Sequence, residues 1–334
     1  MDSRYPIKPI NLAGISTYPL ESRRSKVRAD MFGQPMEGSE NTLEMISKLP
    51  RILAGESLRR LINAIVQART GGKPILWGLG GHVVKVGLGP VIVDLMQSGF
   101  VTGIAMNGSA AIHDFEVAFR GTTSEVVEEQ LGDGRFGMAR ETAEYMNAAT
   151  EEAAADGIGM GEALGRFIEQ GGGKGIVFEQ RHASILAAAY AKNVPVTVHV
   201  AIGTDTIHAH PVASGSAYGE ASHHDFRLFC TMTQELDSGG VYLNVGSAVI
   251  LPEVFLKAVS IVRNLGHRLE EFTTANLDFI QHYRPTQNVL KRPTQHSGQS
   301  VAITGHHEIM VPLIAAALKG ALQSPQAPFE SRHE

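Results

Sequence analysis

The sequence predicts an α/β fold, a Rossmann-like and mostly parallel sheet with helices on both faces and a helical insertion. Short apolar runs alternate with helical patterns along most of the chain, an order typical of right-handed βαβ units. The 334 residues are 43% hydrophobic, which is enough apolar material for the core of one large α/β domain. Small-residue turns follow several apolar runs, and such folds bind ligands at the carboxyl ends of their strands.

The elements are predicted from periodicity and from turn residues. Residues 1–50 are irregular and rich in Pro, Ser and charge, so we expect an N-terminal extension that wraps the body or a neighbouring subunit. Residues 51–325 are expected to form a single Rossmann-like α/β domain. A helix should run from Ser57 and stop at Gly71 and Gly72. The expected strands are Ile75–Leu79, Val101–Met106, Ile176–Phe178, Val196–Ala201, Val241–Val245 and Phe279–His282.

A stretch from about residue 123 to 173 interrupts the alternation of strands and helices. Two or three helices are expected there, including a long one over Arg135–Asp156. The run GDGRFG, residues 132–137, precedes that helix. It has two interpretations, a loop that folds over a ligand or a tight turn with a helix N-cap, and turn chemistry alone favours the second.

Composition and charge exclude several function classes. The net charge of −5 gives no basic footprint for nucleic acid. No apolar run reaches the roughly 18 residues that a spanning helix needs, and the first residues lack a signal-peptide core, so a cytoplasmic location is the default expectation. Cys230, the only cysteine, lies in a helical pattern. It is expected to have a buried packing role, with no disulfide framework.

Two small-residue turns follow the first two predicted strands. Gly78 begins the run GLGGH, which either contacts a cofactor or is a plain tight turn. The segment Ile104–Arg120 reads IAMNGSAAIHDFEVAFR, where the glycine and serine allow a ligand to approach and the helix start offers N–H groups to phosphate or carboxylate. His113 and Asp114 follow in the first turns of that helix. The alternative is a dipole-stabilising Asp114 and a surface His113.

The densest set of ionisable groups follows the fourth predicted strand. This set comprises His199, Asp205, His208, His210, Glu220, His223, His224 and Asp225. Histidines beside carboxylates suit proton transfer. They also suit a nitrogen and oxygen site for zinc or iron, although the spacing matches no strong metal motif.

Five segments in order, within roughly residues 50–320, resemble the deoxyhypusine synthase family. They are residues 76–99, 104–120, 183–196, 240–256 and 305–318. The resemblance implies a deoxyhypusine synthase-like fold, NAD as cofactor, an amine or polyamine substrate and a homotetramer with sites between subunits. It implies cofactor contacts at Gly80, Gly81, His82, Asn107, Gly108, Ser109, Gly246 and Ser247, and substrate contacts at Asp114 and Glu253. Asp205 is the best match to the residue that binds the amine in that family.

The chain departs from that family where its imine chemistry takes place. The family joins the aminobutyl group of spermidine to a lysine in a Ser-Trp-Gly-Lys motif, which is absent here, and Trp77 is the only tryptophan. Lys291 is the only lysine between Tyr283 and Val301, and it is either a displaced nucleophile or a surface or anion-binding lysine. His306 or His307 stands where an acidic residue is expected. The family modifies a translation factor through an imine on the lysine of that motif. Because the motif is absent here, that modification is not the expected activity.

These observations predict a divergent member of the family, an NAD-dependent enzyme that acts on an amine or polyamine-type substrate as a transferase or oxidoreductase. His113, His208 or His210 would act as the base, and Asp205 and Lys291 complete the candidate catalytic set. Two alternatives stay open: a metal-dependent enzyme that uses the cluster from His199 to Asp225, and a non-catalytic ligand-binding paralogue.

Overall fold

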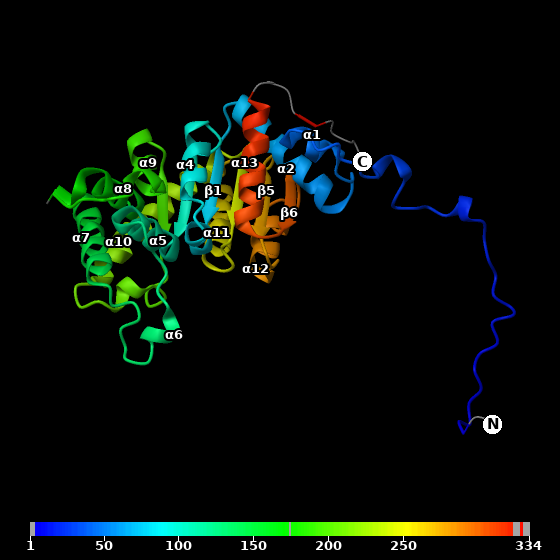
Figure 1. Ribbon diagram of the computed structural model, residues 1–334, viewed down its shortest axis with the longest axis horizontal. Coiled ribbons are helices and arrows are strands. Elements are labelled where there is room, and N and C mark those ends of the chain that lie inside the picture. Colours follow the sequence, from blue (N-terminus) through cyan, green and yellow to red (C-terminus); the bar gives the residue numbers. More distant parts are fainter. Residues whose placement is uncertain (1–3, 174, 323–327, 330–334) are drawn as a thin grey trace.

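The computed structural model describes residues 4–173, 175–322 and 328–329. Their strands form one six-stranded parallel sheet, with helices around it (Figure 1). The strand order is β3-β2-β1-β4-β5-β6, so the predicted Rossmann-like α/β class is confirmed. The strands are β1 (Ile75–Leu79), β2 (Gly103–Asn107), β3 (Val196–His199), β4 (Val241–Val245), β5 (Thr273–Asp278) and β6 (Gln299–Thr304). All five strand pairs are parallel. Trp77 of β1 lies opposite Ile104 of β2, and Leu243 of β4 lies opposite Ala275 of β5.

Helices cover both faces of the sheet and enclose two separate apolar cores. One face carries α2 (Leu53–Thr70), α3 (Gly81–Lys85), α4 (Gly89–Gln97), α5 (Gly108–Arg120), α9 (Ile185–Lys192) and α13 (His307–Ala321). The other carries α10 (Gly215–Gln234), α11 (Ile250–Asn264), α12 (Tyr283–Pro285) and the π-helical segment η6 (Thr286–Lys291). Because side chains alternate along a strand, buried Trp77 belongs to the first core and its neighbour Leu76 to the second. Cys230 is buried in the second core, as predicted.

The predicted strands match the structure where the apolar runs are continuous. Ile75–Leu79 and Val241–Val245 are exact, Val101–Met106 is displaced to Gly103–Asn107, and Val196–Ala201 ends earlier, at His199. Two predictions are wrong. Ile176–Phe178 is irregular, and Phe279–His282 is the loop that follows β5. Both β5, which reads TTANLD, and the edge strand β6, whose exposed and buried residues alternate, escaped prediction because polar residues interrupt their apolar pattern.

The helical insertion lies beside β3, at one end of the sheet (Figure 1). It contains α6 (Val127–Gln130), α7 (Arg140–Asp156) and α8 (Met160–Gln170), so the long helix begins five residues later than the predicted Arg135. In GDGRFG, Gly134 and Gly137 have φ values of +77° and +79°, which is the geometry of tight turns. The carboxylate of Glu125 accepts the Gly137 N–H at 3.1 Å, and Gly137 packs on Thr206. This loop is therefore docked on the chain that follows β3.

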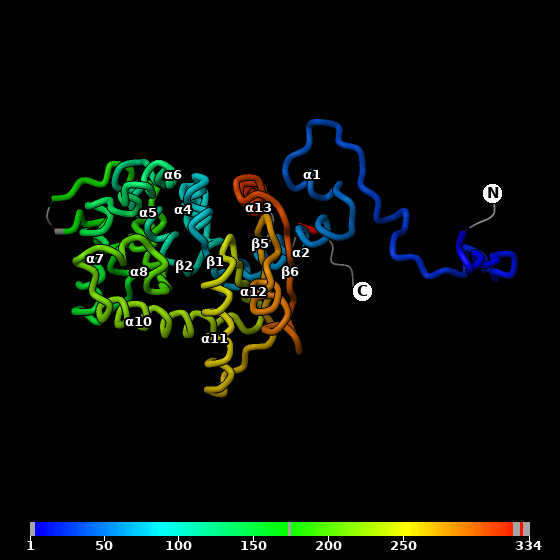
Figure 2. The backbone as a smooth tube through the Cα atoms, turned by 90° about the horizontal axis from the view of Figure 1, so that it is seen from below, coloured from blue at the N-terminus to red at the C-terminus, as the bar shows by residue number. Residues whose placement is uncertain are grey.

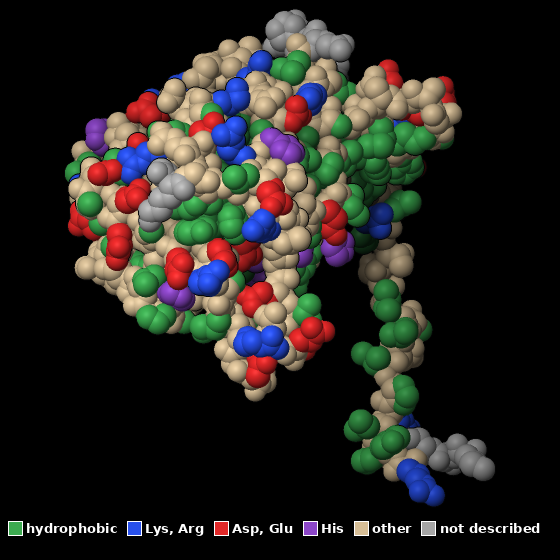
Figure 3. All heavy atoms as spheres, turned by 60° about the vertical axis from the view of Figure 1, so that its left-hand side comes forward, with side chains coloured by type: hydrophobic (Ala, Val, Ile, Leu, Met, Phe, Trp, Pro, Cys, Tyr) green, Lys and Arg blue, Asp and Glu red, His purple; other side chains and the backbone are tan. Residues whose placement is uncertain are grey.

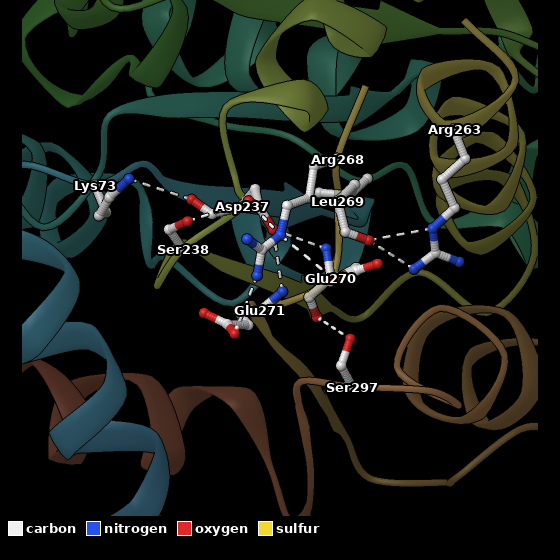
Figure 4. A network of polar contacts seen from close by, with 9 residues as sticks. All are labelled: Lys73, Asp237, Ser238, Arg263, Arg268, Leu269, Glu270, Glu271 and Ser297. Atoms are coloured by element: carbon white, nitrogen blue, oxygen red, sulfur yellow. Dashed lines mark hydrogen bonds and ion pairs between the residues drawn. The ribbon is translucent and has the colours of Figure 1, made fainter. Parts of the chain in front are cut away.

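A polar network holds the amino edge of the sheet together (Figure 4). The carboxylate of Asp237 accepts the N–H groups of Glu270 and Glu271 at 2.8 and 3.1 Å, ahead of β5. The Ser297 hydroxyl donates to the carbonyl of Glu270 at 2.8 Å, and Lys73 donates to the carbonyl of Asp237 at 3.3 Å. These contacts fix the starts of the strands at the amino edge. The candidate ligand site is therefore sought at the opposite, carboxyl edge.

The N-terminal segment leaves the body as an extended chain (Figures 1 and 2). Its first backbone contacts with the body are the Met31 carbonyl, which accepts from Arg51 at 2.9 Å, and Gln34, which donates to Lys48 at 2.8 Å. Helix α1 (Thr42–Lys48) follows, with a capping box formed by Asn41 and Glu44. No helix among the described residues is long and apolar enough to cross a membrane.

Candidate functional site

The strand order reverses between β1 and β4, which makes their carboxyl ends the expected ligand site. The chain leaves β1 toward α3 on one face and β4 toward α11 on the other. Gly80 donates to the Val245 carbonyl at 2.9 Å, and a Cβ at Gly80 would collide with the carbonyl of Gly246. Gly246 itself has a φ of +69°, so both glycines are required by geometry.

The turn after β2 interlocks with the turn after β1. Asn107 caps α5 by accepting the Ala110 N–H at 2.9 Å. The Ser109 side chain lies so close to Gly81 that a Cβ there would collide with its hydroxyl. The structure brings several of the predicted cofactor residues together: Gly80, Gly81, Ser109, Gly246 and Ser247 are neighbours, and His82 is exposed on α3. Ser247 is buried, and its hydroxyl accepts the N–H of Leu251 at 3.2 Å.

His113 lies beside this pair of turns and is oriented by hydrogen bonds. Its Cδ2 is the atom that a Cβ on Gly81 would approach at 3.2 Å. On the opposite side of the ring, Nδ1 is 2.7 Å from the Thr123 hydroxyl, which donates to the carboxylate of Glu116. Thr142 donates to the other oxygen of Glu116 at 3.1 Å. Because the Thr123 proton is committed to Glu116, Nδ1 of His113 carries the proton and Nε2 is the basic nitrogen.

The imidazole of His113 is neutral near pH 7. Burial lowers its pKa to about 4, and the positive charge of Lys85 acts in the same direction. A neutral ring with a fixed tautomer can accept a proton at Nε2, on the side of the turns after β1 and β2.

Asp114 has a structural role that the sequence did not reveal. Its fully buried carboxylate accepts the Ser184 hydroxyl at 2.6 Å and the N–H groups of Ile185 and Leu186 at 2.8 and 3.0 Å. Burial raises its pKa to about 6. These contacts join α5 to the start of α9, so the carboxylate expected to contact substrate is occupied by backbone.

Asp205 and His208 lie at the ends of β2 and β3. The half-buried carboxylate of Asp205 rests on Gly108, where a Cβ would collide with it, and burial raises its pKa to about 6. Nδ1 of His208 accepts the N–H groups of Gly203 and Asp205 at 3.2 and 3.4 Å. The basic nitrogen of His208 is therefore engaged in shaping the loop, which leaves Asp205 as the group that faces the turn of β2.

The remaining members of the histidine cluster are dispersed. His199 is buried against Phe229, and its Nε2 lies 3.0 Å from the Thr197 hydroxyl. The buried carboxylate of Asp225 accepts the N–H groups of Gly161 and Val198 at 3.0 and 2.8 Å. His210 is half-buried, His223 is exposed and His224 is half-buried on α10. Within the part of the chain that the structure describes, no group of three or more His, Cys, Asp or Glu side chains is placed to hold a metal ion.

Two predicted residues lie outside the central turns. Glu253, in the first turn of α11, accepts from Asn288 at 2.8 Å and forms ion pairs with Lys257 and, at 3.3 Å, with Arg284. These cations and hydrogen bonds lower the pKa of Glu253. Lys291 is exposed at the last residue of η6, between the end of β5 and the start of β6. Neither residue is among the nearest neighbours of a Cβ at Gly80 or Gly246, and neither is a hydrogen-bond or ion-pair partner of His113 among the described residues.

Sequence reasoning named His82 and His307 but missed the cluster of rings that they form with Phe279 behind the turn of Gly246. His307 is fully buried, and its Nε2 lies 3.1 Å from the Leu277 carbonyl and 3.8 Å from the Asp278 carboxylate. Its ring centroid is 5.4 Å from that of His82 and 5.9 Å from that of Phe279. Nδ1 of His307 has no hydrogen-bond partner among the described residues. The sequence signal that could have pointed to this role of His307 is its position shortly after β6, at the carboxyl edge of the sheet.

A ladder of side-chain amides was also missed. Asn244 donates to the Ser247 carbonyl at 2.9 Å and to the side-chain oxygen of Asn276 at 2.7 Å. Asn276 donates to Gln281 at 2.8 Å, and Gln281 donates to the Ile303 carbonyl at 3.2 Å. The ladder spans β4, β5 and β6 beneath the turn of Gly246.

A cavity of about 1090 Å³ lies at the opposite, amino edge of the sheet. Its cationic lining includes Arg59, but the buried guanidinium of Arg59 donates to the carbonyls of Ser47, Leu49 and Pro50. These bonds hold α2 against the preceding segment. Arg59 is therefore committed to structural contacts, and we place the candidate site at the carboxyl edge, where the strand order reverses.

Comparison with known proteins identifies similar solved structures. No protein-family model and no curated protein matches the sequence. A protein of Methanococcus maripaludis S2 proposed to be a LOR/SDH protein is 15% identical, with a TM-score of 0.51 over 81% of this chain and 71% of that chain. AgrE in its ternary complex with ornithine and NAD+ is 13% identical, with a TM-score of 0.53 over 83% of this chain and 35% of that chain.

A protein of Entamoeba histolytica proposed to be a deoxyhypusine synthase is 11% identical, with a TM-score of 0.47 over 86% of this chain and 95% of that chain. At these identities the matches to the Methanococcus protein and to AgrE show a shared fold and no more. The chain also spans only about a third of the length of AgrE.

Proposed function

We propose that this protein binds NAD at the carboxyl ends of β1, β2 and β4 and acts on an amine or polyamine-type substrate, as a transferase or an oxidoreductase. The observation that carries the proposal is the meeting of the Gly80–Gly81 and Gly246–Ser247 turns where the strand order reverses. The shared fold of AgrE, which was crystallised with NAD+ and ornithine, supports both parts of the proposal.

The residues of the site fit a dinucleotide. Side-chain-free turns let a ligand approach the backbone at Gly80 and Gly81, and Lys85 adds a positive charge on α3. The carboxylate of Asp205 suits either ribose hydroxyl groups or an ammonium group beside the turn of β2. When bound, NAD would supply a hydride acceptor.

His113 is the residue best placed to move a proton. Glu116 and Thr123 hold its tautomer, so its Nε2 can take the proton that an amine or alcohol loses as its carbon is oxidised. His208 is less suitable because its Nδ1 already accepts two backbone N–H groups. Asp205 would pair with the ammonium group of the substrate. A homotetramer, with sites between subunits, is part of the proposal.

The first experiment uses Trp77, which is the only tryptophan and lies in β1, three residues before Gly80. Bound NADH at the carboxyl end of β1 should quench Trp77 emission and show sensitised nicotinamide emission. The Gly81→Ala variant, whose Cβ would collide with the Ser109 side chain, should bind NADH at least ten-fold more weakly.

The matched control is Gly219→Ala, which adds a methyl group into open space on α10 and should bind as the wild type does. Unquenched wild-type emission at millimolar NADH would refute the cofactor site, and normal binding by Gly81→Ala would place the ligand elsewhere. NAD reduction by a panel of primary diamines and polyamines then tests the substrate class. His113→Asn should lose that activity while still binding NADH.

A further inference from the structure

The N-terminal arm, defined as residues 4–30, exposes apolar side chains throughout its length. Every residue of the arm is exposed. Eight large apolar side chains between 51% and 85% exposed lie along it, namely Tyr5, Ile7, Ile10, Leu12, Ile15, Tyr18, Leu20 and Val27. Figure 3 shows hydrophobic side chains along a chain that stands clear of the body. Exposed apolar area on this scale marks a binding surface, because water disfavours it.

The charge of the arm is opposite to that of the remaining chain. The arm has six basic and two acidic side chains, a net charge of +4, whereas the rest of the chain has 23 basic and 32 acidic side chains, a net charge of −9. A cationic, apolar arm is therefore complementary to the acidic body of this same protein.

We infer that the arm packs against the body of a second copy of this chain, with the arms exchanged between the two copies. Figures 1 and 2 show the arm directed away from its own body in two perpendicular views. An exchanged arm uses the same two surfaces twice, as the two-fold symmetry of a homodimer requires. The inference rests on the self-association that is part of the proposed function, and not on its cofactor chemistry.

The acceptor surface is the apolar patch after β5 and β6. It comprises Phe279, Ile280, Tyr283 and Ile309, which are 44%, 51%, 69% and 65% exposed. The ring of His306 stacks on Phe279 with centroids 6.3 Å apart, so the two loops share one surface. Glu308, which lies 3.8 Å from His306, adds a carboxylate to the patch. Apolar side chains beside an acidic group match the composition of the arm.

Sedimentation velocity of the full chain tests the arm. The full chain is expected to be a dimer or a larger oligomer, and a variant without residues 4–30 is expected to be a monomer with an unchanged circular dichroism spectrum. The full-length variant Ile7→Ser, Ile10→Ser, Leu12→Ser, Ile15→Ser should dissociate in the same way. A monomeric full chain, or variants that remain oligomeric, would overturn the inference, as would binding of a monomer to anionic vesicles.

Disulfide trapping between two separately purified proteins tests the acceptor patch. An Ile10→Cys protein mixed with a Tyr283→Cys protein in the presence of a mild two-electron oxidant should form a mixed disulfide. Cys230 should not compete, because it is buried. The control partner is Leu265→Cys, which is 68% exposed but lies just after α11 at the amino edge of the sheet. Cross-linking to position 265, or to neither position, would contradict this placement of the arm.

Discussion

Asn244 and Asn276 are joined by a hydrogen bond of 2.7 Å between their side-chain amides, across β4 and β5 and beneath the turn of Gly246. Both residues are fully buried. The same Asn244 amide donates to the Ser247 carbonyl, so it connects the sheet to the turn that is proposed to receive the cofactor. Buried side-chain amides of this kind fix one arrangement of neighbouring groups when their donors are satisfied.

Asn244→Asp should destabilise the protein and weaken NADH binding. The substitution keeps the shape but replaces two donated hydrogen bonds with a carboxylate that faces the oxygens of Ser247 and Asn276. We expect a loss of about 3 kcal/mol in the free energy of unfolding at pH 7, because an unsatisfied buried group costs about 1–3 kcal/mol and a charged group costs more. Urea denaturation and the Trp77 quenching assay measure the two effects.

Thr274→Val is the matched control on the neighbouring strand. The Thr274 hydroxyl is buried, and it has no hydrogen-bond partner among the described residues. Valine keeps the shape and removes the unpaired hydroxyl, so stability should rise by about 1 kcal/mol, with NADH binding unchanged. If Thr274→Val were as destabilising as Asn244→Asp, general packing of the sheet would explain both results without the amide ladder.

The sequence predicts the fold where one pattern dominates. The continuous apolar runs Ile75–Leu79 and Val241–Val245 were located to the residue because both strands are buried on each face. In β5, Thr274 and Asn276 occupy buried positions that a hydropathy pattern assigns to a loop. For Asn276, the partner that makes burial tolerable is Asn244 on the neighbouring strand, which is distant in sequence.

Some residues of the candidate site could likewise be predicted from the sequence, and others could not. Glycine positions such as Gly80 and Gly246 were predictable because backbone geometry at strand ends restricts residue type. The roles of Asp114 and His208 were not predictable. A carboxylate that caps a distant helix looks the same in sequence as one that binds a substrate, and a histidine that accepts backbone N–H groups looks the same as a catalytic base. Glu116 and Thr123 were missed because their significance depends on the orientation of His113.

Asp114→Ala tests the capping role against the substrate role. Removal of the carboxylate leaves the Ser184 hydroxyl and the N–H groups of Ile185 and Leu186 without their acceptor, which should cost about 3 kcal/mol or more in stability. Asp114→Asn, which keeps one acceptor oxygen, should lose roughly half as much. Urea denaturation provides the values, and both variants should bind NADH normally once folded. A normal stability combined with a raised KM for the amine would instead favour substrate contact.

Asp225→Ala should be similarly destabilising, by about 2–4 kcal/mol, because its carboxylate joins the start of α8 to β3 through two backbone N–H groups. Burial raises the pKa of Asp225 to about 7 from an ordinary value near 3.8. The folded protein therefore holds this proton more tightly than the unfolded chain, and the associated stability falls as pH rises from about 4 to 7. Comparison of Asp225→Asn with the wild type across this range should show the difference, and parallel curves would contradict it.

The pH dependence of stability should show the opposite sign at His113. Its folded pKa is about 4 and its ordinary value is 6.5, so the unfolded chain binds more protons between these values and stability is lost as pH falls through them. At about 1.4 kcal/mol per pKa unit, the whole interval corresponds to about 3 kcal/mol. His113→Asn keeps an amide donor toward Thr123 and removes the titration. The difference in unfolding free energy between wild type and this variant should therefore grow with pH from 4 to 6.5 and then level off.

Because Asp114 is present in both proteins, its opposing titration cancels in that difference. A flat difference for His113→Asn would mean that folding does not lower the pKa of the ring, which would contradict the buried, neutral base proposed.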